Sequence, residues 1–280
     1  MAWVERGGDV RLWWEERGDG PRVLVGHSYI QHPDVMAGLI DELARDHRVV
    51  RYDARGAGQS TRSGPYDMNT DVDDLLALAE AGGALAAVVA NGDASNRAVH
   101  AASRRPDLIP VVVSLETVPL TAGYASDSDA LVGSGGVLSA LVEMMRNDYR
   151  SGMLAAIQRG NPDMTAADVR DRIDRTVDYI PHEAGLGRLE AWIRDQPGDA
   201  ANALGDRLVI AYEGAGAWFT ADLHERAREF LPAARFERLE GGAISRPDLT
   251  AAVVRAITAA GGDGSSPASP SPAPAPPAGS

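Results

Sequence analysis

Residues 90–96, with the sequence ANGDASN, gather several side chains that could carry chemistry. They follow an apolar run over 85–89 and precede a stretch of small residues that ends before Pro106, a pattern that predicts a strand, a sharp turn and a helix. Asp93 would stand at the start of that helix, where burial would raise its pKa and the helix dipole would lower it. It could therefore act as a general acid or base, or it could simply complement the dipole.

A second group of polar side chains, residues 27–29 (HSY), follows another apolar run over 22–26. Imidazole titrates near neutral pH, so His27 could shuttle protons; a histidine that braces its own loop by hydrogen bonds is the alternative. His32 could line the entrance of a pocket or lie in an exposed loop. Trp218 could line the same pocket or pack on the last helix of the chain.

The bulk composition excludes several classes of function. With no cysteine the chain can form neither disulfides nor thiolate metal sites, and its six histidines show no metal-ligand spacing, so we expect neither a metal nor another cofactor. The net charge of −13 and the lack of a basic stripe argue against nucleic acid as a partner. No leader peptide is recognisable and no apolar run approaches about 18 residues, so we expect a cytoplasmic protein without a membrane span.

Short apolar runs alternate with amphipathic segments along most of the chain. A hairpin is predicted over 3–16, and helices are predicted over 34–46 and 67–81. Because strands separated by helices form parallel sheets, the sequence predicts an α/β fold with a doubly wound, mostly parallel sheet. The predicted strands beyond the hairpin cover 22–26, 49–52, 85–90 and 109–115.

The pattern changes between residues 119 and 204, where strand-like runs vanish and helical periodicity predicts helices over 131–149, 165–177 and 182–195. An insertion at this point would cover the C-terminal ends of the strands, where open α/β sheets bind their ligands. The predicted organisation is a core of residues 1–118 and 205–260, a helical cap of residues 119–204, and a disordered Pro/Ala/Ser-rich tail of residues 261–280.

From about Trp3 to Ala260 the chain resembles the α/β-hydrolase family. Residues 22–28 (RVLVGHS) are similar to the strand that leads into the family's His-Gly oxyanion loop, and residues 47–60 (HRVVRYDARGAGQS) to the next strand and its D-x-R-G-x-G-x-S loop. The spacing Ala98-x-x-x-Ala102-x-x-x-Pro106 is similar to that of the helix after the nucleophile elbow. The resemblance implies an α/β-hydrolase fold with an inserted cap. Residues 207–213 and 235–239 are similar to the last two core strands of the family, and residues 247–257 are similar to its closing helix.

The resemblance also implies that the catalytic triad of the family is substituted. Counting back fourteen residues from Pro106, the family's spacing, places Gly92 where the nucleophile should stand, whereas Asp93 would fit only with a one-residue deletion in the helix. The family's acid would fall at position 215 or 216, an alanine or a glycine, and the segment 239–247 that should hold its histidine contains none. A Ser-His-Asp mechanism needs all three groups within hydrogen-bond reach, so the chain is predicted to lack it.

An oxyanion hole could survive these losses, because the family forms it with backbone donors such as the Tyr29 N–H. We therefore favour an atypical enzyme that performs acid–base chemistry of the lyase, isomerase or cyclase type on a small apolar molecule, with a place in secondary metabolism by analogy only. Its candidate catalytic residues are Asp93, His27 and Tyr29, and its candidate substrate-binding residues are Ser28, His32, Asn91, Gly92 and Trp218.

Two alternative functions stay open at this point. One is a hydrolase in which Asp93 is the nucleophile, although the histidine that would serve as its base is missing. The other is a non-catalytic protein that binds a small-molecule ligand or acts as a scaffold. In either case the cap helices could mediate a homodimer.

Overall fold

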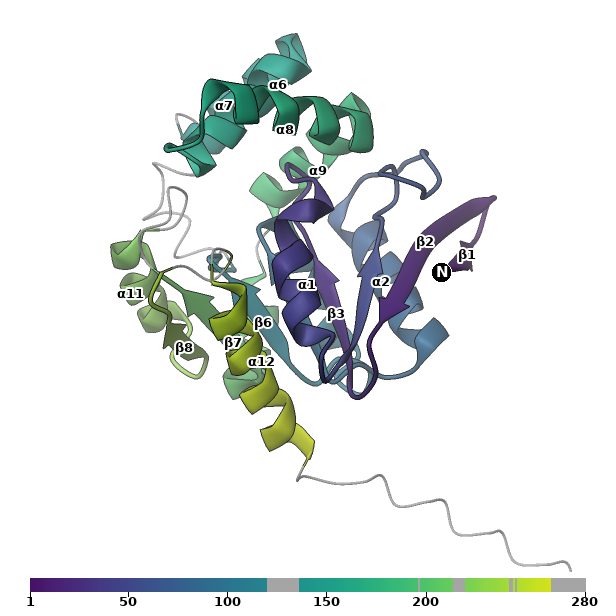
Figure 1. Ribbon diagram of the computed structural model, residues 1–280, viewed down its shortest axis with the longest axis vertical. Coiled ribbons are helices and arrows are strands. Elements are labelled where there is room, and N and C mark those ends of the chain that lie inside the picture. Colours follow the sequence, from purple (N-terminus) through teal and green to yellow (C-terminus); the bar gives the residue numbers. More distant parts are fainter. Residues whose placement is uncertain (120–135, 196, 214–219, 242–243, 245, 263–280) are drawn as a thin grey trace, which may run out of the picture.

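The computed structural model describes residues 1–119, 136–195, 197–213, 220–241, 244 and 246–262 (Figure 1). Their core is an eight-stranded sheet in the order β1-β2-β4-β3-β5-β6-β7-β8. β1 and β2 form the predicted antiparallel hairpin, and the pairings from β4 to β8 are parallel. The predicted doubly wound, mostly parallel α/β sheet is therefore confirmed. The strands are β1 (Ala2–Arg6), β2 (Val10–Arg17), β3 (Arg22–Gly26), β4 (Arg48–Tyr52), β5 (Ala87–Asn91), β6 (Val112–Leu115), β7 (Leu208–Tyr212) and β8 (Arg235–Arg238).

The alternation of side chains along each strand divides the core between the two faces of the sheet. Val23 and Val25 of β3 pack with α1 and α12 on one face, while Leu24 packs with α2 and α3 on the other. Because helices cover both faces, β3, β5 and β6 are buried along their whole length. The core helices are α1 (Ala37–Leu43), α2 (Met68–Gly82), α3 (Asp93–Arg104), α11 (Ala221–Phe230) and α12 (Pro247–Gly262).

The segment predicted as one helix over 34–46 is divided in the structure. A 3-10 turn, η1 (Pro33–Met36), precedes α1, and the side chain of His32 caps this turn by accepting from the Asp34 N–H. Asp34 lies inside this turn, and its carboxylate accepts a hydrogen bond from Arg175 at 2.8 Å. The helical segment therefore begins at Pro33 as a 3-10 turn, and α1 begins only at Ala37.

A helical cap lies over one end of the sheet, with α9 between the core and the helices α6, α7 and α8 (Figure 1). The helices predicted over 165–177 and 182–195 are present as α8 and α9. The helix predicted over 131–149 is present as α6, which ends at Asn147 because the backbone of Asp148 is extended and its carboxylate caps α7. Residues 131–135 lie outside the described residues. The bounds are α6 (Val137–Asn147), α7 (Tyr149–Gly160), α8 (Ala166–Tyr179) and α9 (His182–Arg194), followed by α10 (Gly198–Leu204) and the 3-10 turn η2 (Gly205–Arg207).

Buried ion pairs join the cap to the core. Arg188 of α9 donates two hydrogen bonds to the Asp71 carboxylate of α2, at 2.8 and 2.9 Å, and the two side chains are only 3% and 5% exposed. Arg97 of α3 lies 3.6 Å from the same carboxylate. Burial alone would favour the neutral acid, but the guanidinium groups of Arg188 and Arg97 hold the pKa of Asp71 below its usual value. The position of α9 on the core therefore depends on the pairing of buried charges.

Replacing Arg188 with methionine should lower the free energy of unfolding by about 3–5 kcal/mol, because the Asp71 carboxylate would stay buried without its main partner. Arg175→Met is the matched control: it also breaks a cap–core ion pair, with Asp34, but both side chains are about half exposed. The expected loss for that control is below about 1 kcal/mol. Urea unfolding measures both values, and equal losses would contradict the role assigned to the buried pair.

Candidate functional site

A sharp turn at Gly92 connects the end of β5 to the start of α3. Gly92 has a φ of 57° and a ψ of −137°, a backbone conformation that residues with a side chain adopt only under strain. β3 and β5 are parallel neighbours, so the turn and the loop that follows β3 meet at the same edge of the sheet. This is the edge at which open α/β sheets bind their ligands.

The side chain of Ser28 fills the space directly above this turn. A Cβ atom built on Gly92 would lie 2.8 Å from both the Cβ and the Oγ of Ser28, closer than real Cβ atoms approach a neighbour. Ser28 is itself buried, with 4% of its surface exposed. The glycine at 92 and the serine at 28 therefore fit each other sterically, and the loop after β3 packs on the turn because position 92 has no side chain.

The carboxylate of Asp93 faces the protein interior. Its Oδ1 accepts a hydrogen bond from the backbone N–H of Tyr29 at 2.9 Å, its Oδ2 accepts one from Arg97 at 2.7 Å, and the residue is 2% exposed. Burial raises the pKa of Asp93, and Arg97 and the Tyr29 N–H act in the opposite direction. Asp93 thus fixes the loop after β3 to the start of α3.

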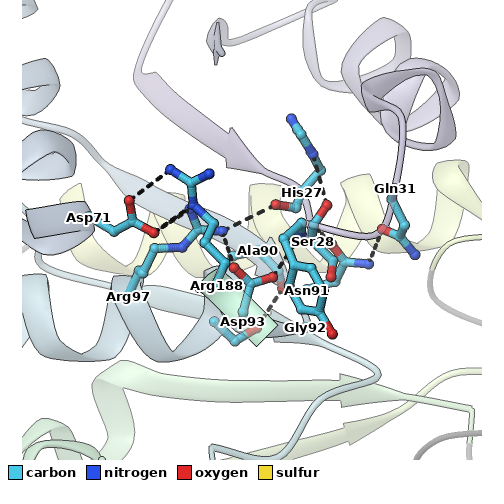
Figure 2. A network of polar contacts seen from close by, with 12 residues as sticks. His27, Ser28, Gln31, Asp71, Ala90, Asn91, Gly92, Asp93, Arg97 and Arg188 are labelled. Carbon is cyan, nitrogen blue, oxygen red and sulfur yellow. Dashed lines mark hydrogen bonds and ion pairs between the residues drawn. The ribbon is translucent and has the colours of Figure 1, made fainter. Parts of the chain in front are cut away.

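Asn91 makes a second connection between the two segments. Its Oδ1 accepts a hydrogen bond from the Ser28 N–H at 3.2 Å, and its Nδ2 donates to Gln31 at 2.8 Å. Figure 2 shows Ser28, Asn91, Gly92 and Asp93 gathered at this point. The backbone N–H groups of Ser28 and Tyr29, which the sequence suggested as an oxyanion hole, are consequently both engaged by side chains of the chain itself.

His27 belongs to a separate cluster under the cap. Its Nδ1 lies 3.1 Å from the carbonyl oxygen of Ser28, so we assign the proton to Nδ1 and a lone pair to Nε2. Nε2 lies 3.3 Å from the hydroxyl of Tyr179 at the end of α8, and that hydroxyl donates to Asp53 at 2.6 Å. Burial lowers the pKa of His27 to about 4 and raises the pKa of Tyr179 well above its usual value. His27 is therefore neutral at pH 7.

The structure divides the residues singled out in the sequence between these two clusters. Ser28, Tyr29, Asn91, Gly92 and Asp93 meet at the turn. His27 and His32 both lie against Tyr179, with ring centroids 5.7 and 5.1 Å away. Trp218 and positions 215 and 216 lie outside the described residues.

Sequence reasoning missed several members of these clusters, namely Arg97, Tyr179, Asp53 and Gln31. Asp53 had a signal, because it opens the D-x-R-G-x-G-x-S motif. Arg97 also had a signal, because it follows Asp93 by four positions, the spacing at which side chains meet on a helix. Tyr179 and Gln31 had none, since their partners are distant in the chain: Tyr179 is 126 positions from Asp53 and Gln31 is 60 from Asn91. Within the described residues no cluster of three or more His, Asp or Glu side chains could hold a metal ion, and no helix is long and apolar enough to cross a membrane.

The strand order, the turn between β5 and α3 and the helical cap define an α/β-hydrolase fold. No family model matches the chain. The chain is 26% identical over 208 residues to 2-(acetamidomethylene)succinate hydrolase of Mesorhizobium japonicum, a match that covers 73% of this chain and 70% of that protein.

Solved structures of other proteins show the same fold. An esterase from Exiguobacterium antarcticum superposes with a TM-score of 0.76 at 15% identity, over 92% of this chain and 98% of that one. A bromoperoxidase from Bacillus anthracis does so with a TM-score of 0.73 at 17% identity, over 91% and 97%. These likenesses confirm the α/β-hydrolase fold that the motifs predicted.

The steric fit between Gly92 and Ser28 can be tested by adding a methyl group. Gly92→Ala should lower the free energy of unfolding by about 1–3 kcal/mol for backbone strain and by about 1–3 kcal/mol more for the clash with Ser28. Gly205→Ala is the matched control, because Gly205 has nearly the same conformation (φ 58°, ψ −130°) with the nearest neighbour of a built Cβ at 3.9 Å. For Gly205→Ala we expect only the loss that comes from backbone strain.

Urea unfolding of the single variants and of Gly92→Ala/Ser28→Gly separates the two terms. The double variant should recover the part of the loss that exceeds the loss in Gly205→Ala. If removing the Ser28 side chain recovers nothing, the fit between the two positions does not hold.

The buried, neutral state of His27 predicts a pH dependence of stability. The unfolded chain takes up a proton on this group near pH 6.5, whereas the folded protein does so only near pH 4. The stability is therefore fully present above pH 6.5 and should fall by about 3 kcal/mol as the pH drops toward 4. Urea unfolding between pH 7.5 and pH 4 should show this loss in the wild type and a correspondingly smaller one in His27→Gln. Identical pH profiles of the two proteins would refute the assignment.

Proposed function

We propose that the protein is an atypical α/β-hydrolase-fold enzyme that converts a small apolar molecule under its cap by acid–base chemistry of the lyase, isomerase or cyclase type. The observation that carries this proposal is the turn at Gly92, which has no side chain and is covered by Ser28. Nucleophilic catalysis at a strand–turn–helix of this kind needs a reactive side chain at the turn residue. A covalent intermediate at this position is therefore not part of the proposed reaction.

We assign proton transfer to His27 in preference to Asp93. Both carboxylate oxygens of Asp93 are already engaged, which supports a bracing role and argues against the nucleophile considered from the sequence. His27 is neutral at pH 7, and its Nε2 lone pair lies beside the hydroxyl of Tyr179, which is held in turn by Asp53. A neutral imidazole can accept a proton at Nε2, and the oxygen of Tyr179, whose own proton is donated to Asp53, can then accept a hydrogen bond from the imidazolium.

The similarity to named enzymes supports a small molecule as the substrate. The proteins that resemble this chain include, besides the M. japonicum hydrolase, an enol-lactonase from Burkholderia xenovorans and an epoxide hydrolase from Bacillus megaterium. These two structures are less than 25% identical to the chain and share only its fold. The proposed reaction type therefore rests on the residues of the site.

A second candidate function is the binding of a small-molecule ligand without turnover. The observation in its favour is that the backbone N–H groups of Ser28 and Tyr29 are satisfied by Asn91 and Asp93. In this arrangement they are not free to stabilise a developing negative charge. The two functions differ in whether a bound molecule is changed.

The proposed function is tested by incubating the protein with a mixture of small apolar metabolites in ¹⁸O-labelled water and following the mixture and the intact protein by mass spectrometry. We expect a substrate to be consumed, a product without ¹⁸O, and no adduct on the protein. His27→Gln should slow this conversion about 100-fold or more, because a positioned acid or base contributes at least that factor. His182→Gln, at an exposed cap histidine, is the control and should leave the rate unchanged.

The other outcomes separate the alternatives. A protein adduct at Asp93 would indicate the nucleophilic hydrolase, and ¹⁸O in the product without an adduct would indicate hydrolysis by activated water. Molecules that are retained by the protein but never changed would favour the ligand-binding function.

A further inference from the structure

The C-terminal end of α9 is attached to the core by a titratable pair. Asp195, the residue that follows α9, lies with both carboxylate oxygens near Nε2 of His100 on α3, at 2.9 and 3.1 Å. We assign a proton to this nitrogen, because a carboxylate only accepts hydrogen bonds. Asn96 of the same helix donates to one of the two oxygens at 2.9 Å. The pair is mostly buried and joins the last residue of the cap helix to the core.

The charge of His100 decides how strong this attachment is. The Asp195 carboxylate lies at the C-terminal end of a 13-residue helix, where the helix dipole disfavours negative charge. A protonated imidazole compensates that charge, whereas a neutral imidazole provides a hydrogen bond only. Imidazole changes its charge near neutral pH, so the attachment is stronger at low pH than at high pH.

Asp195 is the charged group that contacts His100 among the described residues. The other charged side chains near this pair, on α2, α3, α9 and α10, are paired with a different residue or exposed: Asp71, Asp73, Arg97, Arg104, Glu190, Arg194 and Asp199. A change in the charge of His100 therefore acts first on its contact with Asp195.

Polar atoms under this end of α9 are buried at a cost. Nε1 of Trp192, the hydroxyl of Tyr29 and Oδ1 of Asn96 are buried and have no hydrogen-bond partner among the described residues. The rings of Trp192 and Tyr29 meet edge to face, with their centroids 6.2 Å apart. Each such atom is unfavourable by about 1–3 kcal/mol while it is buried, and water satisfies it once it is exposed. The attachments of α9 must therefore offset this cost.

The second attachment of α9 keeps its charges near neutral pH. Arg188, one turn before Trp192, pairs with Asp71 of α2. The guanidinium group stays protonated, and the pKa of Asp71 is held below its usual value. Trp192 thus lies between a fixed contact at Arg188 and a titratable contact at Asp195.

We propose that His100 and Asp195 form a pH-sensitive latch, which holds the last turn of α9 over Tyr29 and weakens when His100 loses its proton. The protonated form of His100 is stabilised in the closed state, so this stabilisation is present at low pH and is lost as the pH rises. Opening of the last turn exposes Trp192 and Tyr29 to water. It also uncovers the loop after β3, at the edge of the sheet where ligands bind. The latch acts on access to this edge and does not depend on the proposed chemistry.

Hydrogen exchange of the Trp192 indole N–H measures the opening. It is followed by ¹H–¹⁵N NMR of the full chain between pH 6 and pH 8.5, and each rate is converted to a protection factor to remove the intrinsic pH dependence of exchange. Trp192→Phe assigns the resonance. The indole of Trp13, which is also buried but lies on β2, is the internal reference.

Three variants separate the latch from other effects of pH. His100→Gln keeps a side-chain donor that does not titrate, and Asp195→Asn removes the charge of the partner. His47→Gln is the matched control, because His47 is a buried histidine that pairs with Asp46 and contacts α12, away from α9. Urea unfolding confirms that each variant is folded, and two latch variants are made so that either one can carry the test.

We expect the protection factor of Trp192 in the wild type to fall about three- to tenfold from pH 6 to pH 8.5, the size of one charge-assisted hydrogen bond in a partly exposed pair. His47→Gln should keep this fall, and His100→Gln and Asp195→Asn should abolish it. The proposal is overturned if the wild-type value does not change with pH, if the fall persists in the latch variants, or if Trp13 loses protection by the same factor. Because this readout needs neither ligand nor turnover, failure of the proposed enzymatic function leaves its result unaffected.

Discussion

The buried guanidinium of Arg97 is the group on which the rest of the site depends. It donates to Asp93 at 2.7 Å, lies 3.6 Å from Asp71, and reaches the carbonyl oxygen of His27 at 3.4 Å. A cation this deeply buried is stable only with anionic partners, and α2 and α3 each supply one. Through Asp93 it holds the loop after β3, and through Asp71 it shares an anion with Arg188 of the cap. One network of charges thus sets the relative positions of the loop after β3, the turn at Gly92 and the helical cap.

This network limits the chemistry that is open to the Asp93 carboxylate at the start of α3. A carboxylate at the start of a helix beside a ligand-binding edge is a plausible acid or nucleophile, but here its oxygens connect the Tyr29 N–H to Arg97. The turn residue is Gly92, which has no side chain, and Ser28 packs over it. The polar groups at this turn therefore support the loop after β3. A shared fold does not by itself fix a reaction, which depends on the side chains at the site.

The sequence predicted the sheet well because its signals are local. Val23, Leu24 and Val25 alternate between two buried faces, and the pattern of apolar runs is visible without knowing their neighbours. It predicted less well where a side chain has a distant partner. Asp34 pairs with Arg175, 141 positions away, a contact that the local pattern does not reveal. Tyr179 gave no signal at all, because its importance comes from contacts with His27 and Asp53.

The sequence by itself determined which chemical groups exist in this protein. It places glycine at 92, provides no cysteine, and contains no histidine between 239 and 247, and no folding can add a missing side chain. Only the tertiary structure decided how the remaining groups are used. Whether Asp93 faces a pocket or pairs internally depends on Tyr29, 64 positions away, and on the burial that makes an unpaired charge unfavourable. The hydrogen-bond partners of a buried group are set by packing, and packing joins residues that are far apart in the chain.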